Sequence, residues 1–334
     1  MASTPAPPPS VYDPAKLSKI PSTYQAITDY FAKFGQVNPF LLRNETFKRI
    51  ENATGRPLIC YVTKTHHVAA GVPAYIDDSD LTGFGDLIAL VAGDALDVFI
   101  VSNGGSAEAS ERIVRLLRGR FTSIRFLVPS NAYSAATLIC FSGDEIVMGS
   151  RGTLGPIDPQ INGVPARAIL RAFENLEGRL KVEGPRALTA YMPLISKYDL
   201  HMLEICKSAQ ELSEELARSW LSTYMLKCPA DDASVTKIVD FFKSFDQHKS
   251  HGRSIDRERA REQGLSKVVN AEDAADLSDL LQSLLNQYDL WFNRTPFYKM
   301  FEDARGTNWG RQVQTVMFQL PLPIPTAPQP PGQP

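Results

Sequence analysis

Residues 129–160 read PSNAYSAATLICFSGDEIVMGSRGTLGPIDPQ, and this stretch predicts the centre of the fold. The apolar strand 123–128 ends at its proline, and the small and apolar residues 134–141 predict a short helix that is buried on all sides. Ser134 therefore lies at or near a helix N-terminus, where free backbone N–H groups and the helix dipole can stabilise an oxyanion. A second strand, 145–148, and a glycine-rich turn follow.

Strands and helices alternate over residues 57–154, which predicts an α/β domain with central parallel strands. The strand 95–102 is followed by Gly104 and Gly105, directly before a helix. Glycines at such a place let bare backbone approach a ligand. If the sheet brings this pair beside Ser134, its N–H groups and that of Ala135 can surround one carbonyl oxygen. The chain has no GxGxxG or GxxxxGK[ST] pattern, which argues against dinucleotide or Walker-type phosphate binding.

Composition narrows the class of protein. With 334 residues, of which 43% are hydrophobic, the chain can bury a large core, and its net charge of -2 argues against a dedicated nucleic-acid binder. No apolar run approaches the roughly 18 residues of a transmembrane helix, and MASTPAPPPS lacks the basic and apolar regions of a secretion signal. We therefore expect a soluble cytoplasmic protein. The cysteines lie far apart and are expected to be reduced core thiols: Cys60, Cys140, Cys206 and Cys228.

We expect four segments along the chain. They are a disordered proline-rich N-terminus (1–18), a helical arm (19–55), the main domain with a helical C-terminal part (56–305) and an extended proline-rich tail (306–334). The arm either packs on a neighbouring subunit or covers its own chain. Apolar residues at helical spacing predict further helices at 165–178, 199–226, 235–245 and 274–293, and a final strand-like run covers 311–325.

Asp77, Asp78 and Asp80 form an acidic turn before a helix. Because no matching glutamate or nearby histidine accompanies them, we interpret them as a solvated turn that caps the helix and not as a calcium loop. We expect neither a metal ion nor a cofactor.

The order of these blocks resembles the serine dehydrogenase proteinase family, a branch of the superfamily that contains Clp protease and signal peptide peptidase A. The matching blocks are SAAT (134–137), DEIVM (144–148), LGPIDPQ (154–160) and SHGRSIDRERAREQGL (250–265), within a resemblance that covers residues 57–305. The resemblance implies a ClpP/crotonase-like fold of repeated ββα units with covering helices. It also implies a homo-oligomer and the hydrolysis of a peptide or protein through a serine acyl-enzyme.

In this resemblance Ser134 corresponds to the nucleophile, and Gly104, Gly105 and Ala135 correspond to the oxyanion hole. A serine hydroxyl needs a neighbouring base. Clp proteases have a histidine shortly after the serine, but this chain has none between His67 and His201.

Three possibilities stay open for the base. The order serine, aspartate, histidine points to Asp158 and His251, with His201 as a weaker candidate, whereas the serine–lysine dyad of signal peptide peptidases points to Lys181 or Lys197. The third possibility is that no base exists. Asp158 and His251 also have structural interpretations, as a turn former and as a partner of the next helix start.

Two other functions remain as alternatives. One is a catalytically inactive ClpP-like oligomeric scaffold whose arm and tails recruit partners. The other is a crotonase-type acyl-CoA enzyme with the same oxyanion hole. The LGPIDPQ block favours the protease branch.

Overall fold

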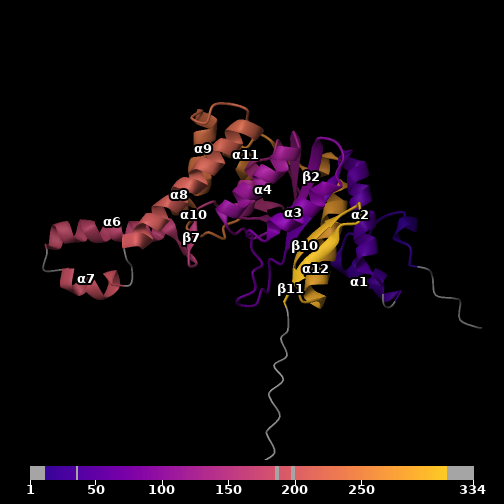
Figure 1. Cartoon of the computed structure of the whole chain (residues 1–334), viewed down its shortest axis with the longest axis horizontal. Helices are drawn as coiled ribbons and strands as arrows, with labels where there is room; N and C mark the ends of the chain where they lie inside the picture. The colour runs from indigo at the N-terminus through magenta and orange to yellow at the C-terminus, as the bar shows by residue number, and fades with distance from the viewer. Residues whose placement is uncertain (1–11, 35–36, 185–187, 197–199, 314–334) are drawn as a thin grey trace, which may run out of the picture.

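The computed structural model describes residues 12–34, 37–184, 188–196 and 200–313 (Figure 1). Its centre is a seven-stranded sheet with the order β11-β10-β1-β2-β3-β5-β9. The parallel strands are β1 (Leu58–Thr63), β2 (Ala95–Val101), β3 (Ser123–Val128), β5 (Glu145–Met148) and β9 (Val268–Asn270). An antiparallel hairpin of β10 (Phe297–Asp303) and β11 (Asn308–Gln312) extends one edge. The predicted α/β class with a mostly parallel sheet is confirmed.

Short strands follow the main strands on the way to the next helix. β4 (Asn131–Ala132) follows β3 and pairs in parallel with β6 (Thr153–Leu154), which follows β5. Ser102, just after β2, makes a parallel bridge to Ala132, and Ile255 makes an antiparallel bridge to Leu154. The order strand, short strand, helix that the family resemblance implies is therefore present in this part of the chain.

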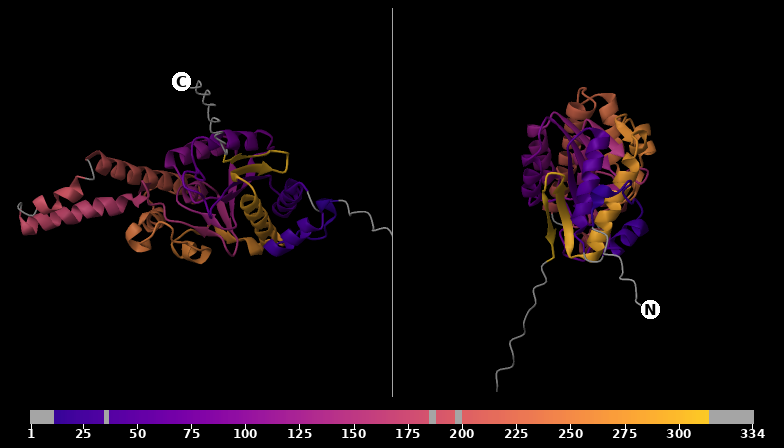
Figure 2. Two further views of the ribbon diagram at one scale, coloured as in Figure 1. Left: turned by 90° about the horizontal axis from the view of Figure 1, so that it is seen from below. Right: turned by 90° about the vertical axis from the view of Figure 1, so that its right-hand side faces the viewer.

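Helices cover both faces of the sheet (Figure 2). On one face lie α3 (Asp80–Ala89), α4 (Ala107–Arg120) and α5 (Ala135–Phe141), and on the other lie α1 (Tyr24–Ala32), α2 (Pro39–Thr54) and α12 (Leu277–Arg294). Alternate residues of β1 enter the two cores: Ile59 and Tyr61 face α3, whereas Leu58 and Cys60 face α2 and α12. Burial on both faces explains why the strands are continuous apolar runs.

The helices of residues 19–55 cover their own chain. Ile27 of α1 and Phe47 of α2 are fully buried in one cluster with Leu284 of α12 and Leu58 of β1. Of the two possibilities left open by the sequence, the structure therefore has the intramolecular one.

A helical arm of a different kind projects from the body (Figures 1 and 2). It consists of α6 (Ala166–Glu183), α7 (Leu188–Ile195) and the first part of α8 (Leu200–Trp220), and a small apolar cluster around Ile169 and Cys206 joins α6 to α8. α8 continues as a π-helical turn, Leu221–Met225, and α9 (Ala233–Lys243), α10 (Phe245–His248) and α11 (Arg257–Glu262) lead back to the sheet. No helix within the described ranges is both long and apolar enough to cross a membrane.

The segment boundaries stay a prediction, although both expected tails carry structure at their inner ends. Tyr12 and Leu17 pack against the core cluster of α1 and α2, and β11 occupies residues 308–312. The outer parts of both tails, 1–11 and 314–334, lie outside the described residues, as does most of the strand-like run 311–325. Three cysteines are buried free thiols and Cys228 is a half-buried one. The homo-oligomer and the cytoplasmic location stay predictions.

Candidate active site

Ser134 occupies a strained turn between β4 and the N-terminus of α5. Its backbone dihedrals are φ 52 and ψ -119, and a positive φ is unfavourable for a residue with a side chain. Sharp strand-to-helix turns of this kind hold the nucleophile of many hydrolases at the head of a helix. Ser134 lines a cavity of about 1020 Å³, and its hydroxyl has no hydrogen-bond partner among the described residues. The predicted position at a helix start is correct, whereas the strain was not foreseen.

The helix behind Ser134 is held rigidly. Every residue of α5 is buried. Thr137 Oγ1 lies 2.6 Å from the Ala132 carbonyl oxygen and 3.0 Å from the Gly155 carbonyl oxygen, and it accepts the Gly155 N–H at 3.0 Å. This hydroxyl therefore joins the serine turn to the LGPIDPQ block, which contains Asp158.

The backbone of Gly104 lies directly against Ser134. A Cβ added at Gly104 would lie 2.6 Å from Ser134 Cβ and 3.1 Å from the Ala135 nitrogen. The Gly104 N–H, however, donates to the buried Ser102 hydroxyl at 3.1 Å. The expectation that Gly104 supplies an oxyanion donor is therefore corrected, because its N–H already donates to Ser102. The lack of a side chain at Gly104 instead lets the backbone approach Ser134 closely. The N–H groups of Gly105 and Ala135 have no partner in the described chain.

Ile76, which is distant in sequence, makes backbone hydrogen bonds to the residues on both sides of Gly105. The Ile76 N–H donates to the Gly104 carbonyl at 2.8 Å, and the Ser106 N–H donates to the Ile76 carbonyl at 2.9 Å. A Cβ at Gly105 would lie 2.2 Å from the Ile76 carbonyl oxygen, so only glycine fits this contact. Sequence reasoning did not identify Ile76, because an ordinary apolar residue gives no signal of this role.

His251 and Asp158 form a hydrogen-bonded pair beside the same cavity. His251 Nδ1 lies 3.0 Å from Asp158 Oδ1, and the Asp158 side chain is 1% exposed whereas that of His251 is 19% exposed. With Nδ1–H donating to the carboxylate, Nε2 is left without a proton and can act as a base. Ser134 and His251 both line the cavity, although no hydrogen bond joins their side chains among the described residues. Catalytic contacts of this kind often tighten only when substrate binds.

The small sheet brings these side chains together. β4 ends two residues before Ser134, and Ala132 of β4 is paired with Leu154 of β6. Leu154 and Ile255 exchange N–H···O bonds of 2.9 Å, which places the segment after His251 beside the segment before Asp158.

The two alternative bases that the structure describes, Lys181 and His201, lie away from the Ser134 cavity. Lys181 is exposed near the outer end of α6, where its Nζ pairs with Glu177 Oε1 at 2.7 Å. A hydrated, ion-paired ammonium is a poor base, so this candidate is not supported. His201 is exposed near the start of α8 and does not line the Ser134 cavity. Lys197 lies outside the described residues.

Two histidines that sequence reasoning missed lie near the site. His66 follows β1 and lines the Ser134 cavity. Its position after the carboxyl end of a parallel strand, where ligands commonly bind, could have identified it from the sequence. His248 is buried in α10, and its Nε2 donates to the Phe241 carbonyl at 2.8 Å. Burial lowers the pKa of His248, so its ring is neutral near pH 7.

The acidic turn is only partly solvated. Asp78 is exposed and pairs with Arg112 at 2.9 Å. Asp80 is fully buried, and its Oδ1 lies 2.7 Å from Nζ of the equally buried Lys299. The interpretation as a solvated cap is therefore wrong for Asp80, because a lysine from β10 reaches it. No cluster of His, Cys, Asp or Glu suited to a metal ion occurs within the described ranges.

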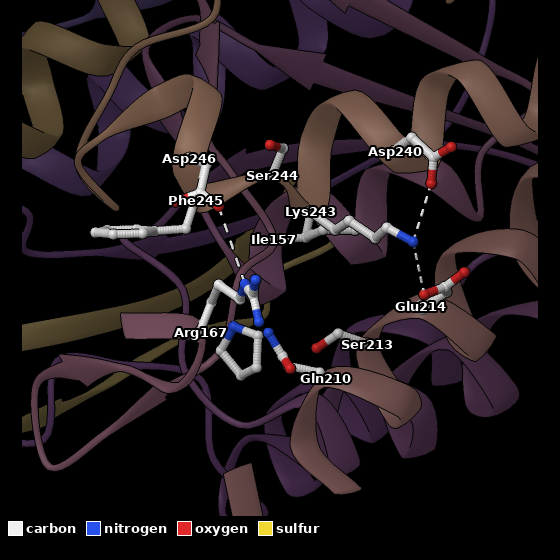
Figure 3. Close-up of a pocket in the computed structure, with 11 residues that line it drawn as sticks. Ile157, Arg167, Gln210, Ser213, Glu214, Asp240, Lys243, Ser244, Phe245 and Asp246 are labelled. Carbon is white, nitrogen blue, oxygen red and sulfur yellow. Dashed lines mark hydrogen bonds and ion pairs between the residues drawn. The ribbon is translucent and has the colours of Figure 1, made fainter. Parts of the chain in front are cut away.

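A second hollow, of about 380 Å³, adjoins the Ser134 cavity (Figure 3). Lys243 Nζ lies 2.8 Å from Glu214 and 2.9 Å from Asp240, and Arg167 lies 3.9 Å from Asp246, so opposite charges on its walls pair with one another. The two hollows share three lining residues: Ile157, Pro159 and Ser213.

Residues 33–189 match the family of ClpP-like SDH-type serine proteinases. The resemblance noted in the sequence blocks is thereby confirmed over this part of the chain. The match includes Ser134 and Asp158 but ends before His251.

Two curated relatives come from Methanocaldococcus jannaschii. The uncharacterized protein MJ1495 is 27% identical over 197 residues, which are 55% of this chain and 67% of the relative. The uncharacterized protein MJ0137 is 29% identical over 139 residues, which are 40% of this chain and 48% of the relative. The chain thus spans about two thirds of one relative and half of the other.

Among solved structures, the chain partly resembles two of the 1510-N membrane-bound stomatin-specific protease. A serine-to-alanine mutant is 18% identical with a TM-score of 0.35, covering 58% of this chain and 74% of that chain. A lysine-to-alanine mutant in complex with a substrate peptide is 20% identical with a TM-score of 0.36, covering 63% and 75%. These values are too low to carry residue roles over to this chain.

Proposed function

We propose that this protein is a serine peptidase with Ser134 as nucleophile, His251 as general base and Asp158 as the group that orients the histidine. The observation that carries the proposal is the 3.0 Å hydrogen bond between Asp158 and His251, because this histidine lines the same cavity as the strained Ser134. The match of residues 33–189 to a family of serine proteinases supports the same reaction class.

In the acylation step, Ser134 Oγ attacks the carbonyl carbon of a peptide bond while His251 Nε2 takes the hydroxyl proton. The tetrahedral intermediate collapses with cleavage of the C–N bond, and the imidazolium gives its proton to the leaving amine. Asp158 stabilises the imidazolium through the Nδ1 hydrogen bond. Water then attacks the acyl-enzyme, with His251 again acting as base, and releases the carboxylic acid and Ser134.

The N–H groups of Gly105 and Ala135 are the proposed oxyanion donors. Ala135 is the first residue of α5, so its N–H lies at the positive end of the helix dipole. Donors held before the reaction begins stabilise the developing negative charge without reorganisation.

Apolar side chains next to Ser134 support an extended peptide as substrate. Leu138 of α5, Leu212 of α8 and Ile157 line the cavity together with Ser134. A peptide whose side chain at the cleavage position is apolar would bury that side chain among these residues.

A fluorophosphonate probe tests the central assignment. The wild type should be labelled, Ser134→Ala should not be labelled, and Ser150→Ala, which changes an exposed serine of the same stretch, should be labelled like the wild type. A folded wild type that neither labels nor cleaves any peptide in a mixed-sequence library would overturn the proposal and favour the inactive scaffold. Binding and turnover of an acyl-CoA without peptide cleavage would favour the crotonase alternative.

A further inference from the structure

Lys299 is a fully buried lysine that contacts the segment around Ile76, the residue whose backbone bonds to both neighbours of Gly105. It lies on β10, with 0% of its side chain exposed, on the face of the sheet that α3 covers. Its Nζ lies 2.7 Å from Asp80 Oδ1 and 2.9 Å from Asp77 Oδ2. The second oxygen of Asp80 accepts the Tyr61 hydroxyl at 2.7 Å and the Asp77 N–H at 3.1 Å. This cluster of Lys299, Asp77, Asp80 and Tyr61 therefore holds the turn at the start of α3 in one position.

Stability alone is a weak explanation for this cluster. A buried ion pair is often no more stabilising than well-packed apolar residues of the same volume, because both charges lose their hydration. Such a cluster can, however, hold a backbone segment in one position, since removing either charge leaves the other uncompensated.

The segment held by Lys299 is the one that positions the oxyanion donor. Asp77 directly follows Ile76, whose backbone bonds to the residues on both sides of Gly105 at 2.8 and 2.9 Å. Tyr75, on the other side of Ile76, has its ring centroid 6.0 Å from Lys299 Nζ and lines the Ser134 cavity. Lys299 thus contacts both neighbours of the residue that brackets Gly105.

We infer that Lys299 is a positioning residue for catalysis: through Asp77 and Asp80 it holds Ile76 in place and so sets the direction of the Gly105 N–H toward the oxyanion. This inference rests on the proposed peptidase function. Loss of an oxyanion donor lowers kcat by about 100- to 1000-fold, and a displacement of about 1 Å by about 100-fold. Removing the Lys299 charge should therefore lower kcat by roughly 10- to 100-fold and leave KM nearly unchanged.

The same strand offers a matched control. Glu302 also lies on β10 and is fully buried, but it belongs to the opposite face of the sheet, where it accepts two hydrogen bonds from Arg43 at 2.7 and 2.8 Å. Neither residue of this pair contacts the segment around Ile76. Glu302→Gln therefore disturbs a buried ion pair of β10 without a path to Gly105.

The test compares Lys299→Gln, Asp77→Asn and Glu302→Gln in the full-length protein. Asp77 is 26% exposed, so its substitution is tolerated more easily if Lys299→Gln does not fold. Urea denaturation gives the stability of each variant, and a fluorogenic peptide cleaved by the wild type gives kcat and KM. Binding of a peptide boronic acid, which forms a tetrahedral adduct with the serine, reports on the oxyanion site.

We expect Lys299→Gln and Asp77→Asn to lose kcat and boronate affinity in parallel, while Glu302→Gln keeps both within about twofold of the wild type at a similar loss of stability. If folded Lys299→Gln and Asp77→Asn have the kcat of Glu302→Gln, or change only KM, the inference is overturned while the peptidase proposal stands. A folded wild type with no peptidase activity and no labelling would overturn both.

Discussion

Replacing Asp158 by asparagine keeps the shape of the side chain and removes its charge. Asp158 Oδ1 lies 3.0 Å from His251 Nδ1, with the carboxylate 1% exposed. A carboxylate only accepts hydrogen bonds, so it keeps the proton on Nδ1 and leaves Nε2 free. An asparagine amide can present its NH₂ group to Nδ1 instead. The proton then moves to Nε2, which can no longer accept the Ser134 proton.

The magnitude follows from this change of tautomer. The wrong tautomer in a serine–histidine–aspartate site lowers kcat by about 10⁴-fold, which is about 5 kcal/mol of activation free energy. We expect Asp158→Asn to lower kcat by roughly 10³- to 10⁴-fold, with KM changed less than about threefold, because the buried Asp158 lies behind the histidine. Its Oδ2 atom has no partner in the described chain, so the free energy of unfolding should change by less than about 2 kcal/mol.

Peptide hydrolysis measured at saturating substrate, with urea denaturation alongside, tests this prediction. Asp97→Asn is the matched control: Asp97 is also fully buried and paired, with Arg56 and Arg125 at 2.8 Å, but it lies on β2 away from the cavity. The control should lose stability and keep kcat. A stable Asp158→Asn variant with kcat within tenfold of the wild type would refute the assignment of Asp158 and, with it, the choice of His251 as base.

Three smaller predictions concern stability. Thr137→Val should lower the free energy of unfolding by about 1–3 kcal/mol in urea denaturation, since it leaves a buried glycine N–H without an acceptor; an unchanged midpoint would contradict this. Burial alone would raise the pKa of Asp144, but a backbone N–H and Arg118 outweigh it and hold the pKa below its usual value. Its stabilisation is therefore complete above about pH 4 and is lost as the pH falls through the lowered pKa of the folded state, so Asp144→Asn should cost about 1–2 kcal/mol near pH 7 and progressively less as the pH falls below about 4. Burial lowers the pKa of His248, so the unfolded chain takes up the proton first and stability should fall as the pH drops below about 6.5. His248→Phe should remove this part of the pH dependence, and an unaltered pH profile of the urea midpoint would contradict the explanation.

Much of the fold could be predicted because its signals are local. The apolar runs 95–101 and 123–128 are strands buried on both faces, and periodic apolar residues locate α6, α8, α9 and α12. The small residues after Ser134 predict a buried helix, and its start is where the structure has it.

The site shows where local signals end. Asp158 and His251 are separated by 93 residues, and the sequence left four bases open because nothing local to a histidine or lysine states which cavity it will line. The antiparallel bridge between Leu154 and Ile255 brings the segment of His251 beside that of Asp158, and so selects this histidine. The burial of Asp80 was likewise hidden, since its partner Lys299 is 219 residues away.

The amino-acid sequence by itself determined the α/β class, the resemblance to a serine proteinase family and the helix start that carries Ser134, because these depend on residue patterns over short stretches of chain. Only the tertiary structure decided that, among the residues it describes, the N–H groups of Gly105 and Ala135 have no partner whereas that of Gly104 has one, and that His251 meets Asp158. Hydrogen bonds and ion pairs act over about 3 Å in space whatever the separation along the chain, so the packing of distant segments, and not the local pattern, sets the geometry of the site.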